Sequence, residues 1–214
     1  MYVDKIIIVD DLCPLKTGEL VKKEFKNNEK IYVIKNRTNL GVGGAVKEGY
    51  KYSLKLEPDF IIKLDGDGQM DPKYINLFKK RAIDQKADYL KGNRFFFSKD
   101  IFKMSLIRLI GNIGVSIMGK FSTGYWNIFD FTNGYTMIRA RILQKINIDQ
   151  LKSNYFFETD LLFHLNLVNA KVYDINIPAK NSDIKSNLKI KKIFMYFIFY
   201  NISNFIKRIY KKYF

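Results

Sequence analysis

Two apolar runs that end in acidic residues constrain the fold of this chain most. One is "KIIIVDD", Lys5 to Asp11, and the other is "IIKLDGDGQMDP", Ile61 to Pro72. A short run rich in β-branched residues is typical of a buried strand. In open α/β sheets, ligands bind beyond the carboxyl ends of the strands, so both acid clusters fall where a binding site is expected.

The rest of the chain alternates between strand and helix patterns. Further strands are predicted at 31–34, 60–64, 89–90 and 171–177, helices at 18–28, 42–56, 72–84, 101–120 and 160–169, and a loop with a short strand at 125–138. This alternation predicts an α/β fold, with a mostly parallel sheet flanked by helices on both faces. A length of 214 residues suits one such domain, at residues 1–180, followed by a tail at 181–214.

The charge balance indicates an anionic partner. The chain has 37 Lys and Arg against 21 acids, a formal net charge of +16, which fits a nucleic acid, a membrane surface or a phosphorylated substrate. No RNP-type or KH-type motif is present, so nucleic acid is not the expected partner. The single cysteine, Cys13, and the single histidine, His164, argue against a disulfide framework, a Cys-rich or His-based metal site and a Ser-His-Asp triad.

The turn after the second acidic strand has the chemistry of a cation site. Asp65 and Asp67 are one residue apart with Gly66 between them, so their carboxylates can turn toward one point and offer oxygen ligands to Mg²⁺ or Mn²⁺ bound to a diphosphate. The alternative is that these acids only end a strand and form Asx turns. An EF-hand is excluded, because Met70 stands where that loop needs glycine and Asn76 where it needs glutamate.

The stretch "NLGVGGAVKEG", Asn39 to Gly49, resembles a phosphate-binding turn but is not a dinucleotide fingerprint. Gly41 and Gly43 fit the GxGxxG pattern, whereas Val46 stands in place of its last glycine. The glycines still allow backbone N–H groups at a helix N-terminus to approach a phosphate or a sugar.

The C-terminal tail combines basic and aromatic residues. Clusters of Lys and Arg flank "IFMYFIFYNISNFI", Ile193 to Ile206, and Asp183 is the one acid in the tail. The apolar stretch is too short and too interrupted for the ~20 apolar residues of a membrane span. It predicts a helix lying in the membrane interface, where each basic residue adds about 1 kcal/mol on an anionic leaflet. The alternatives are a helix packed on the domain and a helix pair in a homo-oligomer.

Five motifs together resemble those of the family 2 glycosyltransferases with the GT-A fold. They are "IIIVDD", "NLGVGGAVKEGY", "KLDGDGQMDP", "FTNGYTMI" and "YFFETDLLFHLNL", in that order over about residues 3–180. The branch that they resemble most is that of the dolichyl- and polyprenyl-phosphate sugar transferases. The resemblance implies inverting transfer from a nucleotide-sugar donor to a polyprenyl-phosphate acceptor, by a peripheral enzyme at the cytoplasmic face of a membrane.

The resemblance also implies roles for the acids and glycines near the nucleotide. Asp10 and Asp11 match acids that hold its base and ribose, and Gly43 and Gly44 match the turn beside it. The DxD motif that binds the metal and the sugar-nucleotide diphosphate is matched by Asp65 and the catalytic Asp67, and an assisting metal-site residue is matched by Gln69.

A second set of residues is implied on the acceptor side. Arg94 and Arg108 fall where the lipid-phosphate branch places arginines toward phosphate, although solvated arginines are common in a basic protein. Glu158 and Asp160 fall where the family keeps acids facing the acceptor. Either acid would act as base for a hydroxyl acceptor, whereas a phosphate acceptor needs none. The simpler interpretation of Glu158 is a charge at a helix start.

One departure from the family pattern affects the expected activity. Complete members begin with an additional strand and helix that end in a "PxxNE"-like stretch, and this chain begins at their second strand. We therefore expect a truncated chain with an unpaired sheet position. Two alternative functions follow: transfer to a sugar hydroxyl in cell-surface polysaccharide assembly, and an inactive membrane-bound paralogue that binds a nucleotide sugar or a partner.

Overall fold

The structure, a computed structural model, describes residues 2–95, 106–178 and 190–213. Its elements follow in the order β1 (Ile6–Asp10), α1 (Thr17–Glu24), β2 (Ile31–Lys35), α2 (Gly41–Leu54), β3 (Phe60–Lys63), η1 (Pro72–Tyr74), α3 (Ile75–Asp84), β4 (Tyr89–Asn93), α5 (Leu106–Thr123), β5 (Thr136–Arg139), α6 (Ala140–Leu143), η2 (Ile148–Gln150), α7 (Phe157–Leu167), β6 (Val172–Asn176) and α8 (Ile190–Tyr213). The predicted start of the helix at 101–120 and the boundary at 180/181 lie outside the described residues.

The strands form two sheets. β1 and β2 pair in parallel, and the second sheet has the order β3-β5-β4-β6. In it β3, β4 and β6 run in one direction, and β5 is antiparallel to both of its neighbours. The α/β class is confirmed, and within each sheet the strands run in one direction, with β5 as the exception. β5 is antiparallel to β4 because the chain re-enters the sheet at the same end at which β4 finishes: Thr136, the first residue of β5, pairs with Lys91. A parallel strand would need a connection that crosses back to the other end of the sheet.

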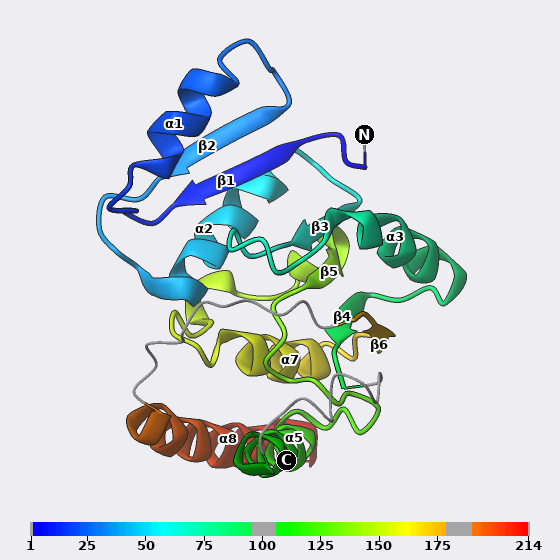
Figure 1. Cartoon of the computed structure of the whole chain (residues 1–214). Helices are drawn as coiled ribbons and strands as arrows, with labels where there is room; N and C mark the ends of the chain where they lie inside the picture. The colour runs from blue at the N-terminus through cyan, green and yellow to red at the C-terminus, as the bar shows by residue number, and fades with distance from the viewer. Residues whose placement is uncertain (1, 96–105, 179–189, 214) are drawn as a thin grey trace.

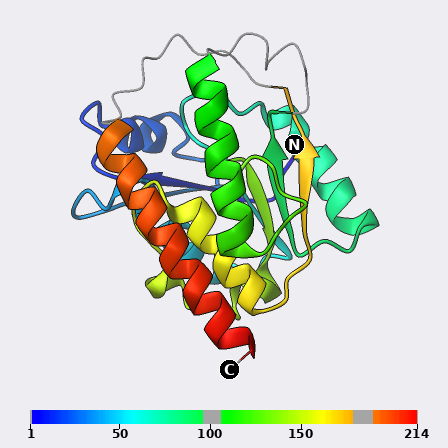
Figure 2. The same cartoon turned by 90° about the horizontal axis from the view of Figure 1, so that it is seen from below.

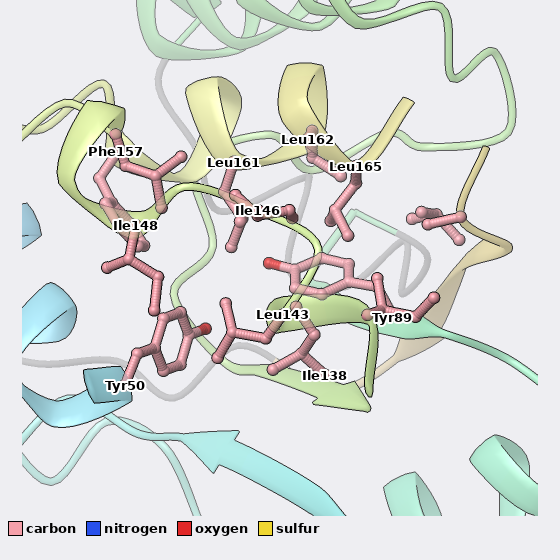
Figure 3. Close-up of a cluster of buried hydrophobic side chains, with 14 of the residues drawn as sticks. Tyr50, Tyr89, Ile138, Leu143, Ile146, Ile148, Phe157, Leu161, Leu162 and Leu165 are labelled. Atoms are coloured by element: carbon pink, nitrogen blue, oxygen red, sulfur yellow. The ribbon is translucent and has the colours of Figure 1, made fainter. Parts of the chain in front are cut away.

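Helices cover both faces of the larger sheet (Figure 1). α7 and α2 lie over one face and α3 over the other, so alternate residues of a strand enter two cores. On β4, Tyr89 joins the core under α7, shown in Figure 3, and Leu90 joins the core under α3. Each fully buried large apolar side chain in these cores contributes about 1.5–3 kcal/mol.

α2 connects the two sheets. Among the described residues, β1 pairs only with β2 and β3 pairs only with β5, while α2 packs against both β1 and β3. The carboxyl ends of β1 and β3 thus lie on either side of the start of α2.

The C-terminal helix α8 packs against α5 and α7 (Figure 2). Polar contacts join them: Ser122 Oγ and Asn201 Oδ1 are 2.6 Å apart, and Arg208 Nη2 donates to the carbonyl of Phe121 at 2.9 Å. Arg208 thereby binds a carbonyl at the end of α5, where a cation is favoured. Within the described residues, no helix has both the length and the apolar content that crossing a bilayer requires.

Candidate active site

Two adjacent cavities lie beyond the carboxyl ends of β1 and β3. The larger has a volume of about 910 Å³, the smaller about 350 Å³, and Val42, Asn154 and Tyr155 line both. The larger is also lined by Asp11, Leu12, Cys13, Pro14, Asn39, Leu40, Gly41, Ala45, Lys152, Ser153 and Tyr200. The smaller is also lined by Lys63, Asp65, Asp67, Thr132, Gly134, Phe157 and Glu158. We call the two together the hollow.

Asp10, at the end of β1, fixes the loop that leads into α1. Its carboxylate accepts the backbone N–H of Cys13 at 2.8 Å and of Gly18 at 3.1 Å, and its side chain is buried. Asp10 lines neither cavity. It satisfies amide donors at a helix N-terminus that would otherwise lack partners.

Asp11 lines the larger cavity and binds the start of α2. Its Oδ1 accepts from Asn36 Nδ2 at 2.7 Å and from the Leu40 N–H at 2.9 Å, and its Oδ2 accepts from the Gly41 N–H at 2.9 Å. These contacts place the negative charge of Asp11 at the positive end of the helix dipole. The α2 N-terminus therefore already holds an anion of the chain itself.

Gly43 and Gly44 face the protein interior and line neither cavity. A Cβ on Gly43 would lie 2.6 Å from the carbonyl oxygen of Lys152, and one on Gly44 would lie 2.5 Å from Leu40 Cβ. The Gly44 N–H donates to the carbonyl of Ser153 at 3.1 Å. The glycines thus let α2 approach the segment 152–157, which walls both cavities.

Asp65 and Asp67 both line the smaller cavity. Asp67 Oδ1 accepts the backbone N–H of Gln69 at 3.0 Å, so Gln69 orients Asp67 through its main chain. A Cβ on Gly134 would lie 2.7 Å from Asp65 Oδ2. Glycine at this position therefore leaves room for the carboxylate.

The donor set fits a divalent cation that arrives with a diphosphate. Among the described residues, no group of three or more His, Cys, Asp and Glu side chains gathers to hold a metal. Two carboxylates alone suit Mg²⁺ or Mn²⁺, which commonly take one or two carboxylates together with substrate phosphates. Asp65 and Asp67 are the residues that would hold it.

Glu158 shares a buried lysine with Asp65. Lys63 Nζ lies 2.8 Å from Glu158 Oε1 and 2.9 Å from Asp65 Oδ1. Burial alone lowers the pKa of Lys63, but the charges of Glu158 and Asp65 outweigh it and raise that pKa above its ordinary value. Lys63 is therefore a fixed positive charge in the wall of the smaller cavity.

A second lysine lies deeper, beside the same glutamate. Lys91 is fully buried, donates to the carbonyl of Asn133, and lies 3.9 Å from Glu158 Oε2. Burial lowers the pKa of Lys91, partly offset by Glu158. In the strand register Lys63, Thr136 and Lys91 stand opposite one another, so the lysines form one row beneath α7.

Asp160 and Arg94 line neither cavity. The carboxylate of Asp160 accepts from the Lys152 N–H and from Asn204 Nδ2, both at 3.0 Å. Arg94 donates from Nε and Nη2 to Asp130 at 2.7 and 3.0 Å. Arg108 lies in α5, and its side chain is not among those described. Of the two acids proposed as a base, only Glu158 lines a cavity.

The fold is also found in a solved structure. The chain is similar to glucosyl-3-phosphoglycerate synthase from Mycobacterium tuberculosis, crystallised with Mn²⁺, UDP and glucosyl-3-phosphoglycerate, with a TM-score of 0.66. The similarity covers 96% of this chain and 69% of that one, at 11% sequence identity. It defines the class of the molecule as a GT-A-like α/β fold.

Sequence comparison then gives the family. Residues 1–147 match the family model described as glycosyl transferase family 2, so this chain belongs to that family. It is 32% identical over 151 residues to an uncharacterized protein of Methanocaldococcus jannaschii, covering 71% of this chain and 59% of that protein.

Two named relatives belong to one kind of enzyme. The chain is 31% identical over 165 residues to UDP-N-acetylglucosamine–dolichyl-phosphate N-acetylglucosaminyltransferase of Methanococcus voltae, covering 72% of this chain and 65% of that protein. It is 24% identical over 173 residues to undecaprenyl-phosphate mannosyltransferase of Micrococcus luteus, covering 80% and 70%. The chain thus spans about two thirds of the length of these relatives.

Proposed function

We propose that this chain is an inverting glycosyltransferase that moves a sugar from a nucleotide-sugar donor to a polyprenyl-phosphate acceptor at a membrane surface. The observation that carries the proposal is the hollow, which has Asp11 at one end and Asp65 and Asp67 at the other. The names of the two enzyme relatives, which act on dolichyl and undecaprenyl phosphates, support this acceptor class.

In the proposed reaction the chain holds the donor across the two cavities. Asp11 fixes the first turn of α2, whose Gly41 and Val42 line the space for the nucleotide. Asp65 and Asp67 hold the metal with the diphosphate, and Gln69 keeps Asp67 oriented. When bound, the cation stabilises the negative charge that grows on the departing nucleotide diphosphate.

The hydrogen bonds of the two acceptor-side acids favour a phosphate acceptor. A hydroxyl acceptor needs a carboxylate that can take its proton, but Glu158 is paired with Lys63 and Asp160 is bound by Lys152 and Asn204. Both carboxylates are thus already engaged by donors of the chain itself. A polyprenyl phosphate is already an anionic nucleophile and needs no such base.

We also propose that the chain binds the membrane through an apolar surface on its two outer helices. The large side chains exposed there are Ile113, Ile117 and Phe121 on α5, Trp126 and Phe129 after it, and Met195, Tyr196, Phe199, Ile202, Phe205, Ile206 and Tyr210 on α8. We call this surface the α5/α8 face. Large apolar side chains exposed together on neighbouring helices are typical of a protein or membrane interaction site.

Charge at the end of the α5/α8 face suits a bilayer with anionic lipids. Lys207, Lys211 and Lys212 are exposed on the last turns of α8, and a helix with apolar and basic residues of this kind lies in the membrane interface. The single thiol, Cys13, fits a reducing compartment, so we place the protein peripherally on the cytoplasmic face.

Turnover separates the proposed activity from its alternatives. The purified chain is incubated with nucleotide sugars, Mn²⁺ and vesicles containing polyprenyl phosphate, and lipid-linked sugar is measured. We expect Asp67→Asn to lose about 100-fold or more in rate, and Asp84→Asn, an exposed acid at the end of α3, to keep it. Full activity in Asp67→Asn would contradict the metal role of Asp67. Sugar transfer only to saccharides would favour the hydroxyl acceptor. Donor binding without turnover would favour the inactive paralogue.

Vesicle binding tests the membrane surface by itself. Phe199→Glu places a charge in the middle of the α5/α8 face, and Ile83→Glu places the same charge on an exposed position of α3. We expect co-sedimentation with phosphatidylglycerol vesicles to fall in Phe199→Glu and to stay unchanged in Ile83→Glu. Equal sedimentation of both variants would refute the assignment of this face to the membrane. If the face instead binds a second copy of the chain, Phe199→Glu without lipid should form a smaller particle than the wild type.

A further inference from the structure

Lys63 is a buried ammonium placed between the carboxylates of the proposed metal site and of the acceptor side. The side chain of Lys63 is 10% exposed, like that of Glu158, whereas that of Asp65 is 39% exposed. Lys63 is thus held from the inside by Glu158 and reaches outward to Asp65. A cation that binds Asp65 comes from the cavity side.

The backbone around this pair leaves little freedom. A Cβ on Gly134 would contact both Lys63 Nζ and Asp65 Oδ2, so the two charged groups fill the space over a glycine. On the other side Lys63 Nζ is 2.8 Å from Glu158 Oε1, and Glu158 is itself near Lys91. The ammonium therefore stays in the wall whether or not Asp65 turns toward another ligand.

We propose that Lys63 is a resident counter-cation of the metal site, which keeps a free divalent ion weakly bound and makes its binding depend on the donor's diphosphate. This inference rests on the proposed function, because it assigns the metal to Asp65 and Asp67. Lys63 is a positioning residue in this role, since it acts through Asp65 and Glu158.

The physical reason is the competition of two cations for one carboxylate. A free Mg²⁺ or Mn²⁺ at Asp65 meets the positive charge of Lys63, already bound to the same carboxylate, and charges this close in a protein wall repel strongly. A nucleotide diphosphate brings negative charge that offsets this repulsion. The metal and the nucleotide then strengthen each other's binding by the same factor.

Direct measurement of Mn²⁺ binding tests the inference without any turnover. Free Mn²⁺ is followed by electron paramagnetic resonance during titration of the wild type, Lys63→Met and Lys91→Met, first without nucleotide and then with UDP or GDP. We expect Lys63→Met to bind free Mn²⁺ at least about tenfold more tightly than the wild type. We also expect added nucleotide to increase the Mn²⁺ affinity of Lys63→Met less than that of the wild type. Lys91→Met is the matched control: it also removes a buried lysine beside Glu158, but Lys91 does not contact Asp65.

A double variant keeps the test decisive. Lys63→Met leaves the buried charge of Glu158 unpaired, which can unfold the protein or give the metal an extra carboxylate. Lys63→Met/Glu158→Gln removes both effects and should still bind free Mn²⁺ more tightly than the wild type. Circular dichroism shows which variants are folded.

The outcomes separate the two levels of the argument. Unchanged or weaker binding of free Mn²⁺ in the folded variants overturns the role of Lys63, as does a gain that disappears in the double variant or appears equally in Lys91→Met. Nucleotide binding by the wild type with no Mn²⁺ binding at any nucleotide concentration overturns the metal role of Asp65 itself, and this inference with it.

Discussion

Asp174 allows a quantitative test of the charges buried beneath α7. It lies on β6, where its Oδ2 accepts from Asn93 Nδ2 at 3.0 Å and from the Phe129 N–H at 2.9 Å. Its Oδ1 is buried and has no hydrogen-bond partner among the described residues. Burial raises the pKa of Asp174 from 3.8 to about 7. The charged groups that act on it are Lys91, Asp130 and Lys120.

The sign of the effect on stability follows from linkage. The folded state holds a proton on Asp174 up to about pH 7, whereas the unfolded state releases it near pH 3.8. Between these values the folded state binds more protons, so the free energy of unfolding falls as the pH rises, by at most about 1.4 kcal/mol per pH unit. From pH 5 to pH 7 the loss is about 2.5 kcal/mol. Asp174→Asn, which cannot titrate, should not show this loss.

Urea denaturation at pH 5, 6 and 7 measures the prediction. The absolute stability of Asp174→Asn also contains the cost of an amide with an unpartnered group, about 1–3 kcal/mol, so the informative quantity is the difference between variant and wild type at each pH. That difference should move by about 2.5 kcal/mol in favour of the variant. Asp84→Asn, at an exposed position, should follow the wild type. A difference that stays constant from pH 5 to pH 7 would refute the reasoning.

Two further substitutions test the packing around the hollow. Gly134→Ala should weaken the binding of nucleotide together with Mn²⁺ by about tenfold, because the new Cβ would collide with both Lys63 Nζ and Asp65 Oδ2; Gly111→Ala on α5, where no atom lies within 4 Å of an added Cβ, should leave this binding unchanged in the same titrations. Asn204→Leu should lower the free energy of unfolding by about 1.5–3 kcal/mol, since it removes a hydrogen bond to the buried carboxylate of Asp160; a urea-denaturation change below about 0.5 kcal/mol would show that this contact does not hold α8.

The strand and helix pattern was predictable because it depends on local periodicity. The apolar runs of β1 and β3 and the helix-like spacing between them place most elements within a few residues of their predicted bounds. Strand direction is different, because it depends on where the chain re-enters the sheet. The run at β5 looks like any other short strand, so its antiparallel pairing with β3 and β4 had no signal in the sequence.

Helix α7 starts earlier in the structure than the sequence predicted. The sequence predicts a helix from residue 160, with Glu158 before it, whereas α7 begins at Phe157. Acids are favoured in the first turn of a helix, so Glu158 and Asp160 both belong to that turn. They are two residues apart on a helix, about 200° around its axis, which is why one faces the cavity and the other faces Lys152 and Asn204.

The lysines of the site were missed, although the sequence holds a signal for them. In "FIIKL" Lys63 has the same parity as the core residue Ile61, and in "YLKGN" Lys91 has the same parity as Tyr89. A lysine at an inward position of a strand needs a buried partner. The identity of that partner could not be predicted, because Glu158 is 95 residues away from Lys63 in the chain.

Helix α8 joins the α5/α8 face to the hollow. Tyr200 lines the larger cavity, and Phe156, just before α7, packs on Tyr200 and Phe197 with ring centroids 5.3 and 4.9 Å apart. Lys152 Nζ lies 4.8 Å above the Tyr200 ring. The segment 152–157 that walls both cavities therefore packs on α8, the helix that also carries Phe199 and other exposed apolar side chains. A force that shifts α8 on a bilayer must shift Tyr200, and with it the wall of the hollow, because closely packed side chains transmit displacement.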